Sequence, residues 1–186
     1  MIRTFRYRET NMIYLSAYNS QWPSLFETEK HVLLKIIGKY IVKIEHIGST
    51  AIPNIRAKPV IDIMIAVNNL DDITPEVISK LENIGYEYIK KYEEGMPFRR
   101  FFQKNNANGI RTHHIHLVEI THDFWIRHLL FRDYLRAHPE EAKRYELLKI
   151  DLAMKFTDTN LYASAKSDFC NEIHKKAISW KNNAST

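Results

Sequence analysis

Apolar residues are spaced differently in the two parts of the chain, and the spacing changes near Thr121. Before Thr121, short runs with apolar residues at alternate positions, typical of strands, alternate with segments at helical spacing. After Thr121 almost the whole pattern is helical. This order predicts an α+β fold in which a mixed β-sheet is backed by helices and the chain ends in a helical part. No repeat or Gly/Ser linker interrupts the pattern, so we expect a single domain over residues 1–186.

The pattern also places the individual elements. We expect strands at residues 41–47, 60–67, 86–89, 99–104 and 112–120, of which the last two form a hairpin around the turn at 105–109. We expect helices at 22–37, from Thr74-Pro75 to just before Gly85, from a cap at Thr121 to 136, from 138 to about 156, and from Asp158 or Thr159 to about 178. Residues 182–186 are expected to fray.

The segment between the first two predicted strands carries the chemistry. Gly48 and Ser49 lie in the connecting loop, and Asp62 lies on the second strand. A glycine lets the backbone approach a phosphate closely, and the hydroxyls of Ser49 and Thr50 can donate hydrogen bonds to its oxygens. A carboxylate on the adjacent strand can then hold Mg²⁺ against the same phosphates, because oxygen ligands suit that ion. A turn without a ligand is the alternative for the common Gly-Ser dipeptide taken alone.

A pair of histidines extends this candidate site. His114 and His116 alternate with apolar residues on a predicted strand, so both imidazoles share one face. If that face is turned toward Asp62, the three side chains form an oxygen and nitrogen ligand set, which favours Mn²⁺, Zn²⁺ or Fe²⁺ over Mg²⁺. The alternative is that one histidine is buried and hydrogen-bonded while the other lines a cleft. His113 points the opposite way and is expected to face solvent or to support the structure.

Four basic residues are candidate phosphate contacts. Lys58 lies in the loop before the strand of Asp62, and Lys166 lies on the last predicted helix. Arg99 and Arg100 face opposite sides of a strand, so one of them can reach the sheet face of Asp62 and bind a phosphate through two N–H groups. A solvated surface side chain is the alternative for each of the four.

Three other polar residues have a structural alternative of at least equal weight. His46, next to the Gly48 loop, can serve as a base or ligand, or can be a hydrogen-bonded support. Arg132 and Arg136 lie one helical turn apart and are expected to form ion pairs that stabilise the structure rather than a ligand-binding stripe.

Composition narrows the class of partner. The formal net charge of +5 suits a polyanion, but Lys and Arg are scattered, so we expect a small phosphorylated ligand such as a nucleoside triphosphate rather than nucleic acid. The single cysteine, Cys170, excludes an internal disulfide and a multi-cysteine zinc site. No apolar run is long enough to span a bilayer, and Met1–Arg8 lacks the apolar core of a signal peptide. We therefore expect a cytoplasmic protein that does not use a membrane; its oligomeric state is open.

Specific motifs resemble those of the GrpB family. They are His46-Ile-Gly-Ser-Thr-Ala-Ile-Pro53 and Ala57-Lys-Pro-Val-Ile-Asp-Ile63, supported by Tyr18, Trp22 and Phe26, by Arg99-Arg100 with Phe102, by His114-Ile-His-Leu117, and by Trp125-Ile-Arg-His-Leu129 leading to Phe131–Arg136. The resemblance covers roughly residues 14–178. It implies the nucleotidyltransferase fold, and related domains occur fused to dephospho-CoA kinases. The nucleotidyltransferase pattern places a second acid two residues after the first, where this chain has Met64.

Together these observations predict a metal-dependent nucleotidyltransferase that acts on a small acceptor. Asp62, His114 and His116 are the expected catalytic residues, and Asp62 and His116 are the expected ligands of a divalent Mg²⁺ or Mn²⁺ ion. The expected phosphate-binding residues are Gly48, Ser49, Thr50, Lys58, Arg99, Arg100 and Lys166. Because Met64 removes one carboxylate from a two-metal clamp, the alternative is a non-catalytic accessory module that binds a nucleotide or a CoA-like ligand.

Overall fold

A computed structural model describes residues 13–183 and contains one five-stranded mixed sheet. The expectations for Met1–Arg8 and for residues 184–186 fall outside the described residues, whereas residues 182 and 183, which were expected to fray, are helical. The strands are β1 (Lys43–Ile47), β2 (Ile61–Val67), β3 (Tyr86–Tyr88), β4 (Arg99–Asn105) and β5 (Arg111–Glu119), in the spatial order β1-β2-β5-β4-β3. The central pair β2 and β5 is parallel, and the other neighbours are antiparallel. The predicted hairpin of β4 and β5 is confirmed.

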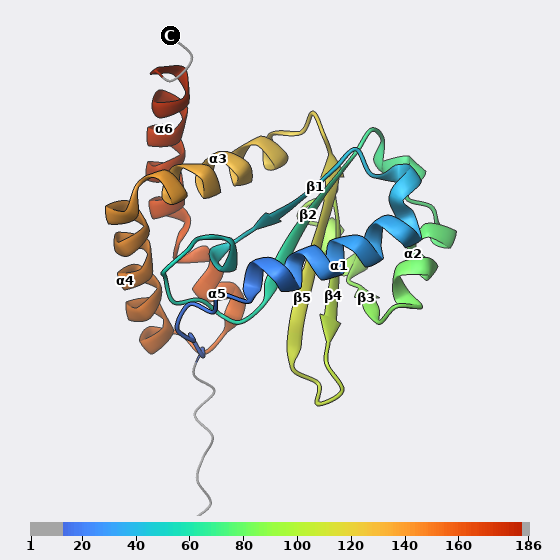
Figure 1. The fold of residues 1–186 in the computed structure, drawn as a ribbon, viewed down its shortest axis with the longest axis horizontal. Coiled ribbons are helices and arrows are strands. Elements are labelled where there is room, and N and C mark those ends of the chain that lie inside the picture. The colour runs from blue at the N-terminus through green and yellow to red at the C-terminus, as the bar shows by residue number, and fades with distance from the viewer. Residues whose placement is uncertain (1–12, 184–186) are drawn as a thin grey trace, which may run out of the picture.

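Six α-helices accompany the sheet (Figure 1). They are α1 (Trp22–Ile37), α2 (Pro75–Glu82), α3 (Asp123–Ala137), α4 (Pro139–Lys155), α5 (Thr159–Ser164) and α6 (Ser167–Asn183), with short 3₁₀ turns at Gly38–Tyr40, Ser49–Ala51, Leu70–Asp72 and Lys90–Glu93. The α+β prediction with a helical C-terminal part is therefore confirmed. None of the helices among residues 13–183 combines the length and apolar character needed to cross a bilayer.

The sheet has two different faces. Helices α1 and α2 cover one face, where alternate residues of β2 and β5 such as Ile63, Ile65 and Ile115 form the largest hydrophobic cluster. Helix α3 lies against the other face, where Met64 packs with Trp125 and neighbouring apolar residues. Alternate side chains of one strand point to opposite faces, so the odd-numbered positions of β2 build the main core. The even-numbered positions, which include Asp62, face α3 and its surroundings.

The structure corrects two predicted helix boundaries. Helix α3 has His122 rather than Thr121 as its N-cap, because the His122 Nδ1 accepts a hydrogen bond from the Phe124 N–H at 3.1 Å. The single predicted last helix is two helices, interrupted at Ala165 and Lys166. The first of them, α5, is capped by Asp158, whose carboxylate accepts two backbone N–H bonds. The interruption places Lys166 at a junction between helices rather than in the middle of one.

Met64 generates the first prediction. Its side chain is fully buried between the sheet and α3, so Met64→Glu places an unpaired charge in an apolar cluster. We expect this change to lower the free energy of unfolding by about 3 kcal/mol or more. The control Met64→Leu keeps size and polarity and is expected to cost less than about 1.5 kcal/mol. Urea denaturation measures both, and equal stability of the two variants would show that α3 does not cover this position.

Candidate functional site

The parallel pairing of β2 and β5 brings the predicted acid and histidines together. In the register of this pair, Asp62 lies opposite His114 and Met64 lies opposite His116, so Asp62 and both imidazoles share one sheet face. The Asp62 Oδ1 lies 2.9 Å from the His114 Nδ1 and 3.9 Å from the His116 Nε2. The first contact is a hydrogen bond, whereas the second is too long for one and is electrostatic. The convergence expected for this histidine strand is therefore present.

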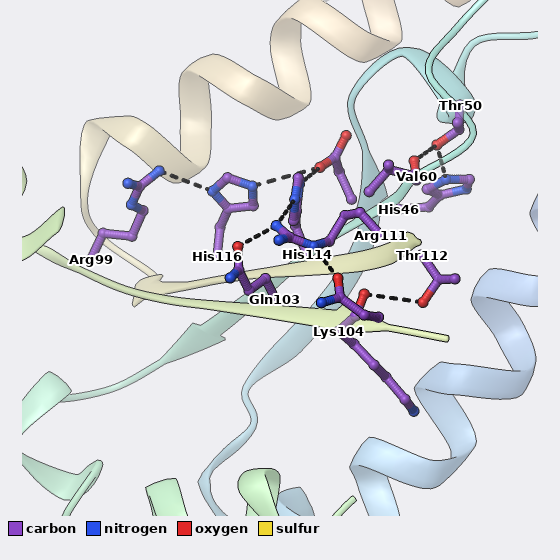
Figure 2. Close-up of polar contacts among 12 residues, drawn as sticks. His46, Thr50, Val60, Arg99, Gln103, Lys104, Arg111, Thr112, His114 and His116 are labelled. Atoms are coloured by element: carbon purple, nitrogen blue, oxygen red, sulfur yellow. Dashed lines mark hydrogen bonds and ion pairs between the residues drawn. The ribbon is translucent and has the colours of Figure 1, made fainter. Parts of the chain in front are cut away.

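Two arginines determine where the histidine hydrogens lie (Figure 2). The Arg99 Nη1 donates to the His116 Nδ1 at 3.2 Å, and the Arg111 Nη1 donates to the His114 Nε2 at 3.3 Å. A guanidinium has no acceptor, so each contacted ring nitrogen carries a lone pair. The other nitrogen of each neutral ring therefore carries the hydrogen, and both of these N–H groups are directed at Asp62.

These contacts keep Asp62 ionised. Burial by itself raises the pKa of its carboxyl, but the hydrogen bond from His114 and the nearby His116 hold that pKa well below its ordinary value. Burial lowers the pKa of His116. It also lowers the pKa of the neighbouring His128 to about 4. The site thus holds an ionised carboxylate beside the imidazole of His116, whose lowered pKa keeps it neutral near pH 7.

The ligand atoms fit one divalent cation. One atom from each of Asp62, His114 and His116 lies within 4.8 Å of the others, so a small adjustment of the side chains would bring all three onto a shared ion. One oxygen and two nitrogens form a mixed donor set, of the kind used by Mn²⁺, Fe²⁺ and Zn²⁺. The position of a second acid is taken by the buried Met64, so these residues match a single ion and not a pair.

Gly48 is required by its contact with Asp62. Its φ is +70°, and a Cβ added there would lie 2.3 Å from the Asp62 Oδ2. Both the backbone conformation and the space therefore demand glycine. The sequence predicted that glycine gives room to a phosphate, whereas in this structure it gives room to the carboxylate. Gly48 thus fixes how closely the loop approaches the acid.

A small polar cavity of about 110 Å³ lies beside this acid. Lysines from three different segments reach it, together with Asp62 and His114 from the sheet. Its lining is Ser49, Thr50, Lys58, Val60, Asp62, His114, Lys149, Tyr162 and Lys166. A larger hollow of about 370 Å³, lined by Ile13, Leu15, Arg56, Ile150, Ala153 and Met154, has mainly apolar walls. The smaller cavity is the one with chemistry suited to an anion.

The three cavity lysines are perturbed by burial. Lys149 is only 1 % exposed, its Nζ donates to the Arg56 carbonyl, and burial together with the nearby Lys166 lowers its pKa to about 7. Burial also lowers the pKa of Lys166 to about 8, and its Nζ lies 3.9 Å from the centre of the Tyr162 ring. The pKa of Lys58 is lowered for the same reason. An anion in the cavity would restore the charged forms of these amines.

The hydroxyls of Ser49 and Thr50 differ in their hydrogen bonds. The Ser49 Oγ lines the cavity and donates to the Tyr145 hydroxyl at 3.4 Å. The Thr50 Oγ1 donates to the Val60 carbonyl at 3.0 Å and contacts the His46 Nε2 at the same distance. The hydroxyl hydrogen of Thr50 is therefore used within the loop, which leaves Ser49 as the loop hydroxyl that can turn to a phosphate.

Arg100 lies away from the site, contrary to its prediction as a phosphate contact. It is on the sheet face opposite Arg99 and pairs with the Glu93 carboxylate at 3.1 Å. It also donates to the Pro97 carbonyl at 3.0 Å. Arg99 is on the face of His116, but it does not line the cavity in this arrangement. Because side chains alternate along β4, only Arg99 of the two arginines lies on the same sheet face as His116.

Three other polar residues have structural positions. His46 stacks on Phe26 of α1, and burial lowers its pKa to about 4. Arg132 pairs with Glu45 at 2.7 Å, and Arg136 donates to a loop carbonyl at 2.8 Å. Arg132 thus forms the expected ion pair, although it is buried, whereas Arg136 donates to a carbonyl instead of pairing with an acid. These bonds attach α3 to β1 and to the loop that follows it.

Sequence reasoning missed Lys149 and Arg111. Lys149 falls on the buried stripe of α4 at helical spacing from Ala142, Tyr145 and Leu152. A lysine at such a position is rarely accidental, because burying an amine costs free energy unless it is paired or used. Its place in the helical pattern was therefore a usable signal. Arg111 lies just after a turn, and its contact with His114 had no local signature in the sequence.

The Gly48 contact generates the second prediction. Gly109 also has a positive φ, +75°, but a Cβ there meets no atom within 4 Å. Gly109→Ala therefore carries only the backbone cost, roughly 1–2 kcal/mol, whereas Gly48→Ala adds the overlap with Asp62. We expect Gly48→Ala to be at least about 1 kcal/mol less stable than Gly109→Ala in urea denaturation. This difference should shrink in an Asp62→Ala background, and a difference that persists unchanged would refute the carboxylate contact.

Lys149 generates the third prediction, on pH dependence. Its pKa of about 7 in the folded chain lies below its ordinary value of 10.5, so the unfolded chain binds more protons between these values. The contribution of Lys149 to the free energy of unfolding therefore rises with pH from about 7 upward. Urea denaturation at pH 7 and pH 9 should show a smaller rise in Lys149→Met than in the wild type. Lys155→Met, an exposed lysine on the same helix, should keep the wild-type rise; a Lys149→Met rise that also matches the wild type would contradict the assignment.

Known proteins are similar to this chain in sequence and in fold. A family model described as GrpB protein matches residues 12–176. The chain is 38 % identical over 182 residues to the UPF0157 protein YqkA of Bacillus subtilis, covering 97 % of this chain and 52 % of that protein. It is 38 % identical over 164 residues to the glutamate-rich protein GrpB of Alkalihalophilus pseudofirmus, covering 87 % of this chain and 93 % of that one.

Another relative is much longer than this chain. The chain is 27 % identical over 182 residues to the dephospho-CoA kinase of Mycobacterium tuberculosis, covering 86 % of this chain and 44 % of that protein. The chain thus spans about half the length of YqkA and less than half that of the mycobacterial protein. Those proteins therefore contain segments that this chain does not match.

A solved structure has the same fold. The crystal structure of conserved protein GrpB from Enterococcus faecalis matches with a TM-score of 0.80 at 36 % identity, covering 90 % of this chain and 99 % of that one. The family model spans most of the residues that build the sheet, the acid, the histidines and the lysine cavity. By sequence and by structure, the chain belongs to the GrpB protein family.

Proposed function

We propose that this protein binds the phosphate groups of a nucleotide-class small molecule in the lysine-lined cavity, together with one divalent cation held by Asp62, His114 and His116. The observation that carries the proposal is the meeting of two sets of groups in one place. Three lysines and Ser49 line the cavity, and Asp62 and His114, two of the three metal-ligand candidates, form part of its wall. A cation and a polyanion would therefore be bound side by side.

Electrostatics supports an anionic ligand of several charges. Lys58, Lys149 and Lys166 enclose a cavity whose own carboxylate is already hydrogen-bonded to His114. Bringing ammonium groups together in a buried space is unfavourable, and the lowered pKa values of Lys149 and Lys166 reflect that cost. A di- or triphosphate offsets these charges, whereas a neutral ligand leaves the cost in place. The cavity has room for phosphate groups, so the nucleoside part would extend beyond it.

The proposed reaction is transfer of a nucleotidyl group to a small acceptor, in line with the nucleotidyltransferase fold that the family resemblance implies. In that reaction a bound divalent cation supplies neutralisation of charge on the reacting phosphate. Asp62 and the two histidines would hold the cation, and Lys58 and Lys166 would stabilise negative charge as it develops. Ser49 would orient a phosphate oxygen.

Met64 favours a second candidate, a binding module without transfer activity. The second carboxylate of a two-metal clamp is absent, and α3 covers its position with apolar side chains. An accessory module for a nucleotide or CoA-like ligand keeps the cavity and needs no second ion. The name of the mycobacterial relative is consistent with a CoA-like ligand, although that protein is more than twice as long as the matched segment.

Titration calorimetry tests the binding that both candidates require. We expect wild-type protein to bind Mn²⁺ and, in its presence, ATP, CTP or GTP. Asp62→Asn should abolish Mn²⁺ binding because it removes the anionic ligand atom. Lys166→Met should weaken triphosphate binding about tenfold, the value of one lost charge-assisted hydrogen bond. Lys155→Met removes an equal charge outside the cavity and serves as the control.

The outcomes separate the candidates. If Lys166→Met and Lys155→Met bind triphosphate equally well, the cavity is not the phosphate site and the proposal fails. If binding is as expected, release of pyrophosphate from ATP, CTP or GTP with a pool of small acceptors identifies a transferase. Binding without release in that assay identifies the accessory module.

A further inference from the structure

Arg99 and Arg111 occupy positions that a metal site does not normally offer. Histidines that bind a metal through one nitrogen usually donate the N–H of the other to a carboxylate, a carbonyl or water. Here the far nitrogens of His114 and His116 instead accept hydrogen bonds from arginines, at 3.3 and 3.2 Å. The surroundings of the two imidazoles therefore suit the hydrogen-bonded, metal-free arrangement.

The same imidazole rings cannot accept hydrogen bonds from the arginines and bind a metal at once. A cation bound by the three ligand atoms near Asp62 needs lone pairs on the His114 Nδ1 and the His116 Nε2. A neutral imidazole has one lone-pair nitrogen, so its hydrogen must then lie on the nitrogen that faces the arginine. In each pair the imidazole N–H and the arginine N–H would then point at each other, and neither group offers an acceptor. Metal binding and these arginine contacts are mutually exclusive.

Arg99 and Arg111 differ in the other hydrogen-bond partners that they have. Arg111 keeps other acceptors, because its guanidinium also donates to the side-chain oxygens of Gln103 and Asn105. Arg99 has no comparable support. Its Nε is buried without a hydrogen-bond partner, and no carboxylate of residues 13–183 lies within ion-pair distance of it. It rests on the rings of Phe101 and Phe124, at 4.9 and 5.7 Å from their centres. Arg99 is therefore a partly buried cation whose Nε donor has no hydrogen-bond partner among residues 13–183.

We propose that Arg99 couples metal binding to phosphate binding. In the metal-free site it donates to His116; when a cation occupies Asp62, His114 and His116, it leaves that nitrogen and pairs with a phosphate of the ligand. A guanidinium is suited to this exchange, because it can bind a phosphate through two N–H groups at once. The proposal rests on the proposed function of the same site, and it adds that metal and phosphate bind cooperatively through this one side chain.

A coupling measurement tests the role of Arg99, with Mn²⁺ and inorganic pyrophosphate as probes. The affinity for each is measured with and without the other, corrected for the complex that they form in solution. By linkage, each should raise the affinity for the other by the same factor. In Arg99→Leu we expect this factor to fall about tenfold, while Mn²⁺ alone binds at least as tightly as in the wild type, because the competing donor is gone.

Two matched variants separate the specific effect from a loss of charge or of folding. Arg100→Leu removes the neighbouring arginine on the opposite face and should keep the wild-type coupling. Arg99→Lys keeps the charge but loses the two-pronged donor, so it should restore the coupling only in part. An Arg99→Leu variant with unchanged coupling would overturn the proposal, as would an equal loss in Arg100→Leu.

Imidazole ¹⁵N NMR of the wild type gives an independent readout. In the metal-free protein the hydrogen should lie on Nδ1 of His114 and on Nε2 of His116. With Zn²⁺ both hydrogens should appear on the other nitrogen, and Zn²⁺ binding without this exchange would refute the coupling. If neither metal nor pyrophosphate binds to the wild type, the proposed function itself fails. If both bind but independently, only the role of Arg99 fails.

Discussion

The ionised carboxylate of Asp62 is the constraint on which the site depends. It is pressed against Gly48, whose missing side chain leaves the space that the Asp62 Oδ2 fills. On its other side it accepts the hydrogen bond of His114. These contacts fix the loop after β1 relative to β5, and they join strands that the sequence separates by about fifty residues. The parallel pairing of β2 and β5 and the position of the loop are thus tied to one charged group.

The side chains that pack over the sheet face of Asp62 decide which groups can reach its carboxylate. Helix α3 seals the face just beyond Asp62, with Trp125 and its neighbours packed on Met64. The sealed side excludes water and a second charged ligand, whereas the open side leads to the lysines. The buried Met64 therefore helps to define the site, because it leaves Asp62 as the carboxylate on this part of β2. The arginines on the same face complete a network that balances this single negative charge.

Local spacing was sufficient to predict most of the fold and part of the site. Alternation along β5 placed His114 and His116 on one face. Register was not predictable in this way, because it depends on pairing between distant segments. The choice between Arg99 and Arg100 depended on that register. The break before α6 also lacked a signal, since residues on both sides keep helical spacing.

Some residues of the site lie on strands, and others lie on or beside helices. The acid and the histidines lie on strands β2 and β5, while Lys149 lies on α4 and Lys166 lies at the junction before α6. Strands held on both sides by neighbours tolerate little change, but a helix pair at the edge of a sheet can shift or exchange side chains. Divergence among homologous chains can therefore change the lysines around the cavity more readily than it changes the three side chains that meet on the sheet.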